Sequence, residues 1–188
     1  GDRGHRALQS LQVREIVFAQ RDQDPVVGAR EVELVGGGIV GAAIAMYLAE
    51  AGARVTLFEK AGPAMGATRN SFAWLNAFVA DPHYRALRLA SMATYRNIDR
   101  PLGLGITWGG YLNWARDEIQ AAVVRANAEM LASSFPVQWL GAEEIAALSP
   151  QLQPGPISAA LYSAIDGHLD PVHVTRCFLD RAVAKGAL

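Results

Sequence analysis

A glycine-rich turn between a short apolar strand and a helix constrains this chain more than any other feature. The turn is GGGIVG at residues 36–41, and it follows the apolar residues Val32, Leu34 and Val35. An alanine-rich stretch at 39–51 comes directly after it. Strand, Gly-x-Gly-x-x-Gly turn and helix in this order are typical of the start of a βαβ unit. The sequence therefore predicts an α/β fold that contains a Rossmann-like unit.

Each glycine of the turn has a separate physical role. Gly36 allows a sharp turn out of the strand, Gly38 lets a pyrophosphate approach the backbone, and Gly41 permits close packing of helix and strand. The free N–H groups at the helix start, around Ile39 and Val40, favour a bound anion without a lysine. The missing Gly-Lys-Ser/Thr ending argues against a P-loop. We therefore predict that residues 36 and 38–41 hold a dinucleotide pyrophosphate.

An acidic residue follows at the expected distance. Gly52 closes the helix, and Val55 and Leu57 alternate along a second strand toward Glu59. An acid at this position accepts hydrogen bonds from an adenosine ribose and disfavours a 2′-phosphate, which argues against NADP. We include Lys60, the next residue, in the predicted site. The alternative is an ordinary βαβ unit in which Glu59 is a solvated charge at the strand end.

Glu33 departs from the pattern of a buried central strand. An unpaired charge there is costly, so an apolar residue is expected. Two explanations remain open, a position nearer the strand edge or a cationic partner.

Composition excludes several classes of function. The chain has 188 residues, of which 51% are hydrophobic and 19% charged, and its net charge is -1. Nucleic acids and anionic membranes call for a basic field that this chain lacks, and no apolar run is long enough for a membrane span. The single Cys177 allows no internal disulfide, fits a cytoplasmic location, and is expected to be a small core residue rather than a nucleophile. The four histidines lack metal-ligand spacing, so no metal is expected.

A polar loop follows the second strand. The run AGPAMGATRNSFAWLNA at 61–77 contains small residues that let backbone N–H groups approach a cofactor. The side chains of Thr68, Asn70 and Ser71 can add hydrogen bonds, and we include Ala67 beside them in the predicted site. The alternative is a surface connection in which Trp74 merely packs.

The segments EVELVGGGIVGAAIAMYLAEAGARVTLFEK (31–60) and GATRNSFAWLNA (66–77) resemble the FAD-dependent amine and amino-acid oxidoreductases of the D-amino acid oxidase, glycine oxidase and sarcosine oxidase group. The segment GHLDP at 167–171 is similar to the same family. The resemblance implies FAD as cofactor, with Glu59 on the adenosine ribose. It also implies that the loop matching 66–71 lies along the cofactor toward the flavin ring.

The resemblance further implies oxidation of a C–N bond in a small amine or amino acid, with hydride transfer from the α C–H to the flavin. In the sarcosine oxidase branch this loop carries basic residues, and Ala73 and Asn76 occupy their places here. Carboxylate recognition of that type is therefore in question, although Arg69 lies nearby in the sequence. We name no catalytic residue.

The remaining elements predict the start of a mixed α+β substrate domain. Asp81-Pro82 begins a helix to about Asn97 with a core-facing stripe of Tyr84, Leu87, Leu89, Ala90, Ala93 and Tyr95. Two short strands with a turn at Gly109-Gly110 are expected over 106–115, with aromatics used mainly in packing. Further predictions are a helix over 117–131 that has Ile119, Val123, Ala126 and Met130 at its period and is ended by Phe135-Pro136, strands at 137–140 and 159–162, a helix at 143–148, a turn at 166–167 and a helix capped by Asp170-Pro171.

We expect an N-terminal extension (1–30), a Rossmann-like FAD-binding portion (31–100), a partial substrate domain (101–170) and a helix returning to the FAD domain (171–188). The chain is expected to stop about halfway through such a fold, so that a C-terminal half or a partner chain completes it. A rival interpretation is therefore a non-catalytic FAD- or nucleotide-binding subunit or fragment. An NAD-dependent dehydrogenase would share residues 36–59 but leaves the loop at 66–71 unexplained.

Overall fold

The computed structural model describes residues 30–132, 134 and 137–188. The predictions for residues 1–29 and for a helix end at Phe135-Pro136 lie outside these residues. The elements are β1 (Glu31–Val35), α1 (Ile39–Glu50), β2 (Arg54–Phe58), β3 (Trp74–Leu75), α2 (Pro82–Leu102), β4 (Tyr111–Ala115), α3 (Glu118–Ala132), β5 (Gln138–Trp139), α4 (Ala142–Leu148), β6 (Ala159–Ser163), β7 (Gly167–His168) and α5 (Pro171–Ala184).

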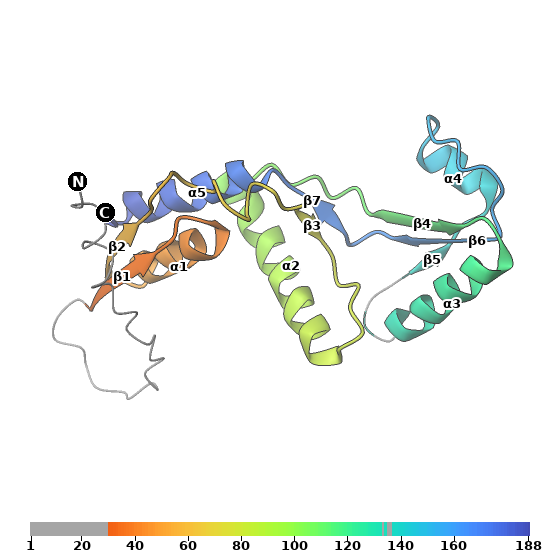
Figure 1. The fold of residues 1–188 in the computed structure, drawn as a ribbon, viewed down its shortest axis with the longest axis horizontal. Coiled ribbons are helices and arrows are strands. Elements are labelled where there is room, and N and C mark those ends of the chain that lie inside the picture. The colour runs from red at the N-terminus through yellow and green to blue at the C-terminus, as the bar shows by residue number, and fades with distance from the viewer. Residues whose placement is uncertain (1–29, 133, 135–136) are drawn as a thin grey trace, which may run out of the picture.

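One end of the molecule is a βαβ unit (Figure 1). β1 and β2 are parallel, with Glu31 opposite Arg54 and Val35 opposite Phe58, and α1 connects them. The buried face of α1 consists of Ala42, Ala45, Met46 and Ala49, which share a core with Val174, Phe178 and Ala182 of α5. Because three of the four α1 residues are alanine, the backbones of the two helices can approach closely. The predicted fold class, α/β with a parallel βαβ start, is confirmed.

The last residue of the chain extends the parallel pairing. The N–H of Leu188 donates to the Val55 carbonyl (2.9 Å), and the Leu57 N–H donates to the Leu188 carbonyl (2.8 Å). On the β1 side, the Arg54 N–H donates to the Arg30 carbonyl, and the Gly36 N–H donates to the Phe58 carbonyl. β2 therefore has a partner along each edge.

The opposite end of the molecule carries an antiparallel sheet in the order β4–β6–β5, with α3 and α4 beside it (Figure 1). Ala121, Val124 and Ala128 of α3 form a core with Ala115 and Leu161 of the sheet. Between the two ends, β3 pairs with β7 in antiparallel fashion, with Trp74 opposite His168. The mixture of parallel and antiparallel strands agrees with the expected mixed α+β continuation.

The predicted hairpin at Gly109-Gly110 is wrong. Residues 107–115 form one extended segment, in which Thr107 pairs with His168 and β4 pairs with β6 from Ala115↔Ala159 to Tyr111↔Ser163. Gly110 (φ +78°) bends this segment without reversing it, and its N–H donates to the Asp166 carbonyl. Residues 159–168 run antiparallel to it over their whole length, so β6 and β7 follow one another in the same direction. The turn predicted at residues 166–167 lies at Ala164 and Ile165 instead, and it interrupts this partner segment without reversing it.

The aromatics of this segment take part in packing, as expected. Tyr111 lies against Trp74 and Phe78, with ring centroids 4.6 and 4.9 Å apart. Trp108 lies under the Arg96 guanidinium, 3.8 Å from ring centroid to Cζ, and its indole N–H donates to Asp99. The contacts of Trp108 with Arg96 and Asp99 join α2 to the segment that precedes β4.

A buried carboxylate joins β3 to the end of β6. Asp166 is fully buried, its Oδ2 accepts the indole N–H of Trp74 (2.8 Å), and its Oδ1 accepts the Ser163 hydroxyl (2.6 Å). Burial raises the pKa of Asp166, and the two hydrogen bonds partly oppose that rise. The carboxylate thus holds together segments that are far apart in the sequence.

Helix α2 begins where predicted, since the Asp81 carboxylate accepts the Tyr84 N–H at 2.7 Å. It continues to Leu102 and ends at Gly103 in the left-handed region (φ +65°). The predicted core stripe is wrong in part: Tyr84 and Leu87 are 48% and 61% exposed, and Ala90 and Ala93 are also exposed.

The charged residue Arg85 occupies the buried face of α2 instead. Its guanidinium donates to the carbonyls of Val79, Ala80 and Met130 and to the Ser134 hydroxyl. These hydrogen bonds satisfy a buried cation without a carboxylate, which a pattern of apolar residues cannot reveal.

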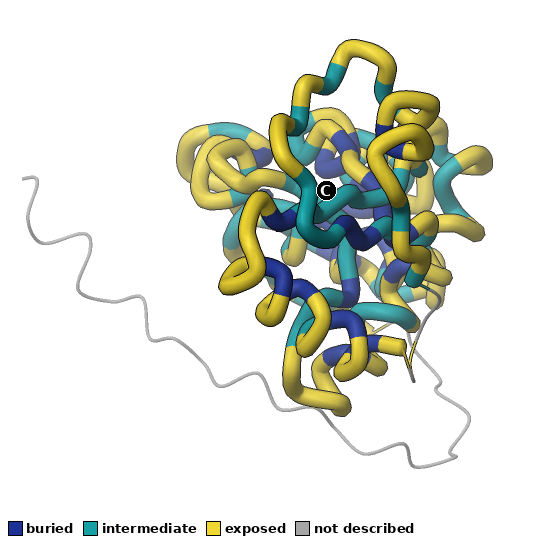
Figure 2. Tube along the Cα trace, turned by 90° about the vertical axis from the view of Figure 1, so that its right-hand side faces the viewer, coloured by how far each residue is buried: buried dark blue, intermediate teal, exposed yellow. Residues whose placement is uncertain are grey.

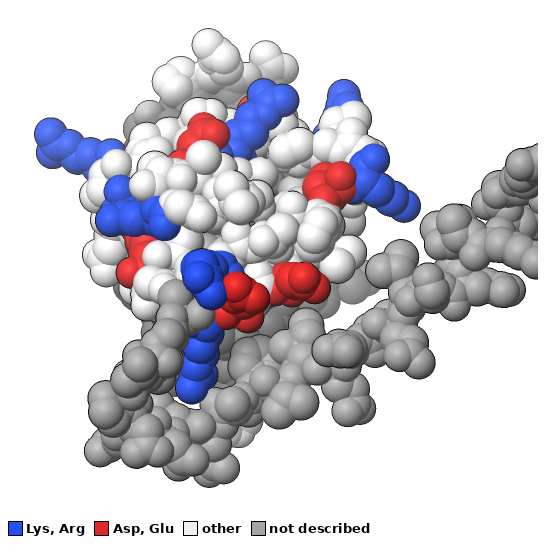
Figure 3. All heavy atoms as spheres, turned by 90° about the vertical axis from the view of Figure 1, so that its left-hand side faces the viewer, with Lys and Arg blue, Asp and Glu red and all other residues white. Residues whose placement is uncertain are grey.

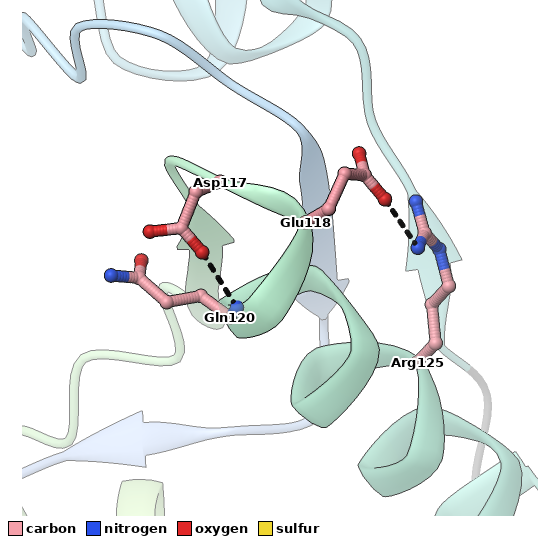
Figure 4. A network of polar contacts seen from close by, with 4 residues as sticks. All are labelled: Asp117, Glu118, Gln120 and Arg125. Carbon is pink, nitrogen blue, oxygen red and sulfur yellow. Dashed lines mark hydrogen bonds and ion pairs between the residues drawn. The ribbon is translucent and has the colours of Figure 1, made fainter.

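Helix α3 is capped by Asp117, whose carboxylate accepts the Gln120 N–H, and Glu118 pairs with Arg125 on its surface (Figure 4). Its predicted apolar face is turned toward solvent, with Ile119 and Val123 83% and 59% exposed. The residues that pack are the smaller Ala121, Val124 and Ala128, together with Leu131. The helix was predicted correctly and its buried face was not.

The structure also settles the positions of Glu33 and Asp170. Glu33 is exposed on β1, so no buried charge arises there. The Asp170 carboxylate accepts the N–H groups of Val172 and His173, which confirms it as the cap of α5.

Burial follows the inner faces of the elements, and exposed segments surround them (Figure 2). Among the described residues, no helix combines the length and apolar character needed to cross a membrane.

Candidate functional site

The glycine turn has the close packing that its sequence predicts. Gly36 has φ +106°, which an L side chain rarely adopts. A Cβ added to Gly41 would lie 2.0 Å from the Gly36 carbonyl oxygen, so only glycine allows α1 to start this close to the end of β1. The glycine turn therefore places the N-terminus of α1 directly at the end of β1.

The start of α1 is suited to an anion. Gly38 is the N-cap, and the first helical turn, all within the described chain, contains no acidic residue. The Ile39 N–H donates to the Thr68 hydroxyl at 3.1 Å, and a Cβ added to Gly38 would lie 3.0 Å from the same oxygen. The Ile39 N–H, which the sequence predicts to be free, is therefore already bonded to the loop. The helix dipole still favours a phosphate at this point, and Gly38 has no side chain to cover the backbone.

Glu59 stands directly beside the turn. Its Oε2 accepts the Gly37 N–H at 2.7 Å, and its Oε1 accepts the N–H groups of Ala61 (2.8 Å) and Gly62 (3.4 Å). These backbone hydrogen bonds, that of Ala61 first and that of Gly37 second, lower the pKa of Glu59. A carboxylate can accept about four hydrogen bonds, so an exposed Glu59 retains capacity for a ribose hydroxyl.

The loop after β2 returns to the turn. The Ala64 N–H donates to the Gly37 carbonyl, and Ala64 is buried with φ +62°. Its later part brings Thr68 to the start of α1, whereas Asn70 and Ser71 are exposed and hydrogen-bond to the loop carbonyls of Gly66 and Thr68. Lys60 and Ala67 are exposed on the same segment.

The structure thus brings some of the predicted site residues together and leaves the others along the adjoining loop. Gly36, Gly38, Ile39, Gly41, Glu59 and Thr68 meet at the end of β1, with Val40 exposed on the first turn of α1. Lys60, Ala67, Asn70 and Ser71 lie along the adjoining loop. Sequence reasoning missed Gly37, which links the turn to Glu59, and Ala64, which links the turn to the loop. The position of Gly37 between two motif glycines was the available signal, whereas Ala64 had none.

The residues present fit the phosphate and ribose portions of a dinucleotide. A bare backbone, a helix N-terminus and an ionised acceptor adjoin one another, and this end of the molecule presents lysine, arginine and acidic side chains interspersed rather than a basic field (Figure 3). A dinucleotide bound here would be held mainly by main-chain groups, which is the arrangement that the sequence predicts for a dinucleotide-binding βαβ unit.

Cys177 and Arg69 lie outside this arrangement of groups. Cys177 is partly buried on α5, where burial raises the pKa of its thiol, and its Sγ lies 3.5 Å from His173 Nε2. Arg69 is exposed on the loop, with Nη1 3.7 Å from the sulfur of Met65.

The fold and site define a nucleotide-binding unit of the flavoprotein type. Residues 32–188 match the family described as FAD dependent oxidoreductase, so the chain belongs to this family. It is 34% identical over 170 residues to the tRNA 5-methylaminomethyl-2-thiouridine biosynthesis bifunctional protein of Thiobacillus denitrificans, covering 87% of this chain and 27% of that protein. It is 30% identical to the monomeric sarcosine oxidase of Streptomyces avermitilis, covering 84% and 42%.

A solved structure gives the same result. The crystal structure of glycine oxidase from Geobacillus kaustophilus superimposes with a TM-score of 0.77 and 27% identity, covering 85% of this chain and 46% of that one. The resemblance to glycine and sarcosine oxidases expected from the sequence is confirmed. The chain spans less than half of the length of each of these relatives.

Proposed function

We propose that the protein binds FAD and oxidises the C–N bond of a small amine or amino acid. One observation carries the cofactor assignment: the Glu59 carboxylate accepts the Gly37 N–H at the point where Gly38 opens the start of α1. The substrate class is supported by the family and by relatives named as glycine and sarcosine oxidases.

In this proposal the chain supplies binding and orientation. The start of α1 would hold the pyrophosphate, Glu59 would accept hydrogen bonds from the adenosine ribose, and residues 67–71 would line the path beyond Thr68. Lys60, next to Glu59, belongs to the same ribose end. When bound, FAD would accept the electron pair released from the substrate C–H bond.

The rival candidate is a unit that binds FAD or another nucleotide without catalysis until a further polypeptide completes the site. The observation that favours it is the coverage of less than half of each relative. An NAD-dependent enzyme is a weaker candidate, because the family match is to FAD dependent oxidoreductases.

The visible absorption spectrum of the purified chain tests these candidates. Flavin bands that bleach when glycine or sarcosine is added without oxygen would support the oxidoreductase. Flavin bands without bleaching by any amino acid would support the binding unit. The nucleotide released by denaturation identifies the cofactor, and release of NAD in place of FAD would overturn the proposal.

A further inference from the structure

The side chains of His173 and Cys177 lie together on the first half of α5, apart from the glycine turn. The two residues are four positions apart, so the helix presents them on one face, one turn from each other. Cys177 Sγ lies 3.5 Å from His173 Nε2. Both atoms also approach the carbonyl oxygen of Gly103, which is 2.9 Å from Nε2 and 3.9 Å from Sγ. A sulfur, an imidazole nitrogen and a carbonyl oxygen therefore converge between α5 and the end of α2.

The separations of these three atoms match those of ligands that share one zinc-like cation. Three points with these separations all lie about 2.0 Å from a common centre, and zinc binds sulfur at about 2.3 Å and imidazole nitrogen at about 2.0–2.1 Å. An ion slightly out of the plane of the three atoms would therefore reach all of them. In tetrahedral coordination, a sulfur and a nitrogen at those bond lengths are about 3.5 Å apart, as they are here.

The surroundings of the three atoms also suit a cation. His173 and Gly103 are exposed and Cys177 is partly buried, so water can supply the fourth ligand of a tetrahedral ion. The negative charge of Asp180 is near enough to contribute to the raised pKa of the Cys177 thiol. The same charge favours a cation beside the sulfur.

The types of donor atom decide which cation fits. Thiolate and imidazole favour Zn²⁺, whereas Mg²⁺ and Ca²⁺ call for oxygen ligands. In the described part of the chain, no three His, Cys, Asp or Glu side chains are grouped to hold a metal ion, so the ligands here are two side chains and one carbonyl. The sequence predicts no metal because the histidines lack metal-ligand spacing, and the pair found here joins one histidine to the single cysteine. A site with two side-chain ligands should bind its ion reversibly.

We propose that Cys177, His173 and the Gly103 carbonyl form an exchangeable Zn²⁺ site that links α5 to the end of α2. Binding releases the thiol proton to the solvent and leaves the imidazole neutral, with its remaining proton on Nδ1. Because α5 shares its core with α1, the ion would brace the helix that packs against α1 behind the glycine turn. The site requires no flavin and does not depend on the proposed oxidoreductase activity.

Co²⁺ is a suitable probe, because a thiolate bound to cobalt gives a near-ultraviolet charge-transfer band that zinc lacks. Cys177 is the only cysteine in the chain, so such a band can arise from no other residue. Adding Co²⁺ to the reduced chain should give a saturable band that Zn²⁺ removes and a large excess of Mg²⁺ does not. Cys177→Ser should abolish the band. His173→Gln should weaken cobalt binding at least about tenfold, since even the outer-shell partners of a metal contribute about 10–100-fold.

Two further histidine variants complete the test. His83→Gln removes an exposed histidine from the start of α2 and should leave cobalt binding unchanged. His173→Cys replaces the imidazole with another zinc ligand and should restore the affinity that His173→Gln loses, with a stronger band. This rescue distinguishes a lost ligand from a damaged fold.

Thermal unfolding tests the link between the two helices. Zinc should raise the unfolding midpoint of the wild type and should leave that of Cys177→Ser unchanged, because an ion that binds only the folded state stabilises it. Absence of the cobalt band in the wild type, equal cobalt affinity in His173→Gln, or a loss of affinity in His83→Gln would overturn the proposal. A zinc-induced rise of the midpoint that is equal in wild type and Cys177→Ser would also overturn it.

Discussion

The carboxylate of Glu59 and the N–H of Gly37 are joined by a 2.7 Å hydrogen bond across 22 residues of sequence. This bond ties the end of β2 to the turn between β1 and α1. It therefore places the proposed ribose acceptor and the proposed phosphate site in one rigid arrangement.

Glu59→Gln should weaken the binding of FAD and should make the free energy of unfolding less sensitive to a fall in pH. The hydrogen bonds to the Glu59 carboxylate lower its pKa in the folded state, so ionised Glu59 stabilises the fold above the unfolded pKa. That contribution is lost as pH falls through the folded pKa. Urea unfolding from pH 7 to pH 3 should show a wild-type advantage that shrinks on acidification. An advantage that grows at low pH would contradict the assigned direction.

Gly41→Ala separates helix propensity from packing. Propensity alone would make alanine more favourable by about 1 kcal/mol inside α1. The new Cβ would instead meet the Gly36 carbonyl oxygen at 2.0 Å, and overpacking of this kind costs about 1–3 kcal/mol. We expect a net loss in the free energy of unfolding. Gly109→Ala, whose Cβ would be 3.8 Å from the nearest atom, is the control, and a Gly41→Ala variant more stable than wild type would refute the packing argument.

Asp166→Ala should destabilise the centre of the molecule. It leaves the indole N–H of Trp74 and the hydroxyl of Ser163 without their acceptor, at about 1–3 kcal/mol for each buried group. Burial raises the pKa of Asp166, so its contribution is full below the unfolded pKa and declines as pH rises through the folded pKa. The difference between wild type and variant should therefore narrow with rising pH, opposite to Glu59→Gln. If the stability difference from wild type changed with pH in the same way for both variants, one of the two assigned pKa directions would be wrong.

Cys177 should react slowly with iodoacetamide in the folded protein. Burial and the neighbouring Asp180 raise the pKa of the thiol, which lowers the fraction of reactive thiolate at neutral pH. The alkylation rate should increase steeply with pH and should approach that of a free thiol in denaturing urea. A folded-state rate at pH 7 equal to that of free cysteine would indicate an activated thiol instead.

The elements with local signals could be predicted from the sequence. The glycine turn, Glu59 and the caps at Asp81 and Asp170 are each specified by a few neighbouring residues. These signals were sufficient because turns and caps depend on short-range sterics and hydrogen bonds.

The faces of helices and the partners of strands could not be predicted in the same way. Arg85 is buried because Val79, Ala80, Met130 and Ser134 surround its guanidinium, and two of these acceptors come from distant segments. The hairpin expected at Gly110 is absent from the described fold because Thr107 and β4 find their partners in residues 159–168. The cleft that residues 74–76 and α2 line together likewise depends on how α2 lies against β3.

The pairing of Leu188 with β2 has a practical consequence for protein engineering. Both backbone groups of Leu188 are already committed to the ladder, on the edge of β2 opposite β1. Any polypeptide fused directly after this residue begins beside β2, so its first residues either lengthen the parallel sheet or pull the edge away from it. A fluorescent or affinity fusion at this end therefore calls for strand-compatible residues before any flexible spacer.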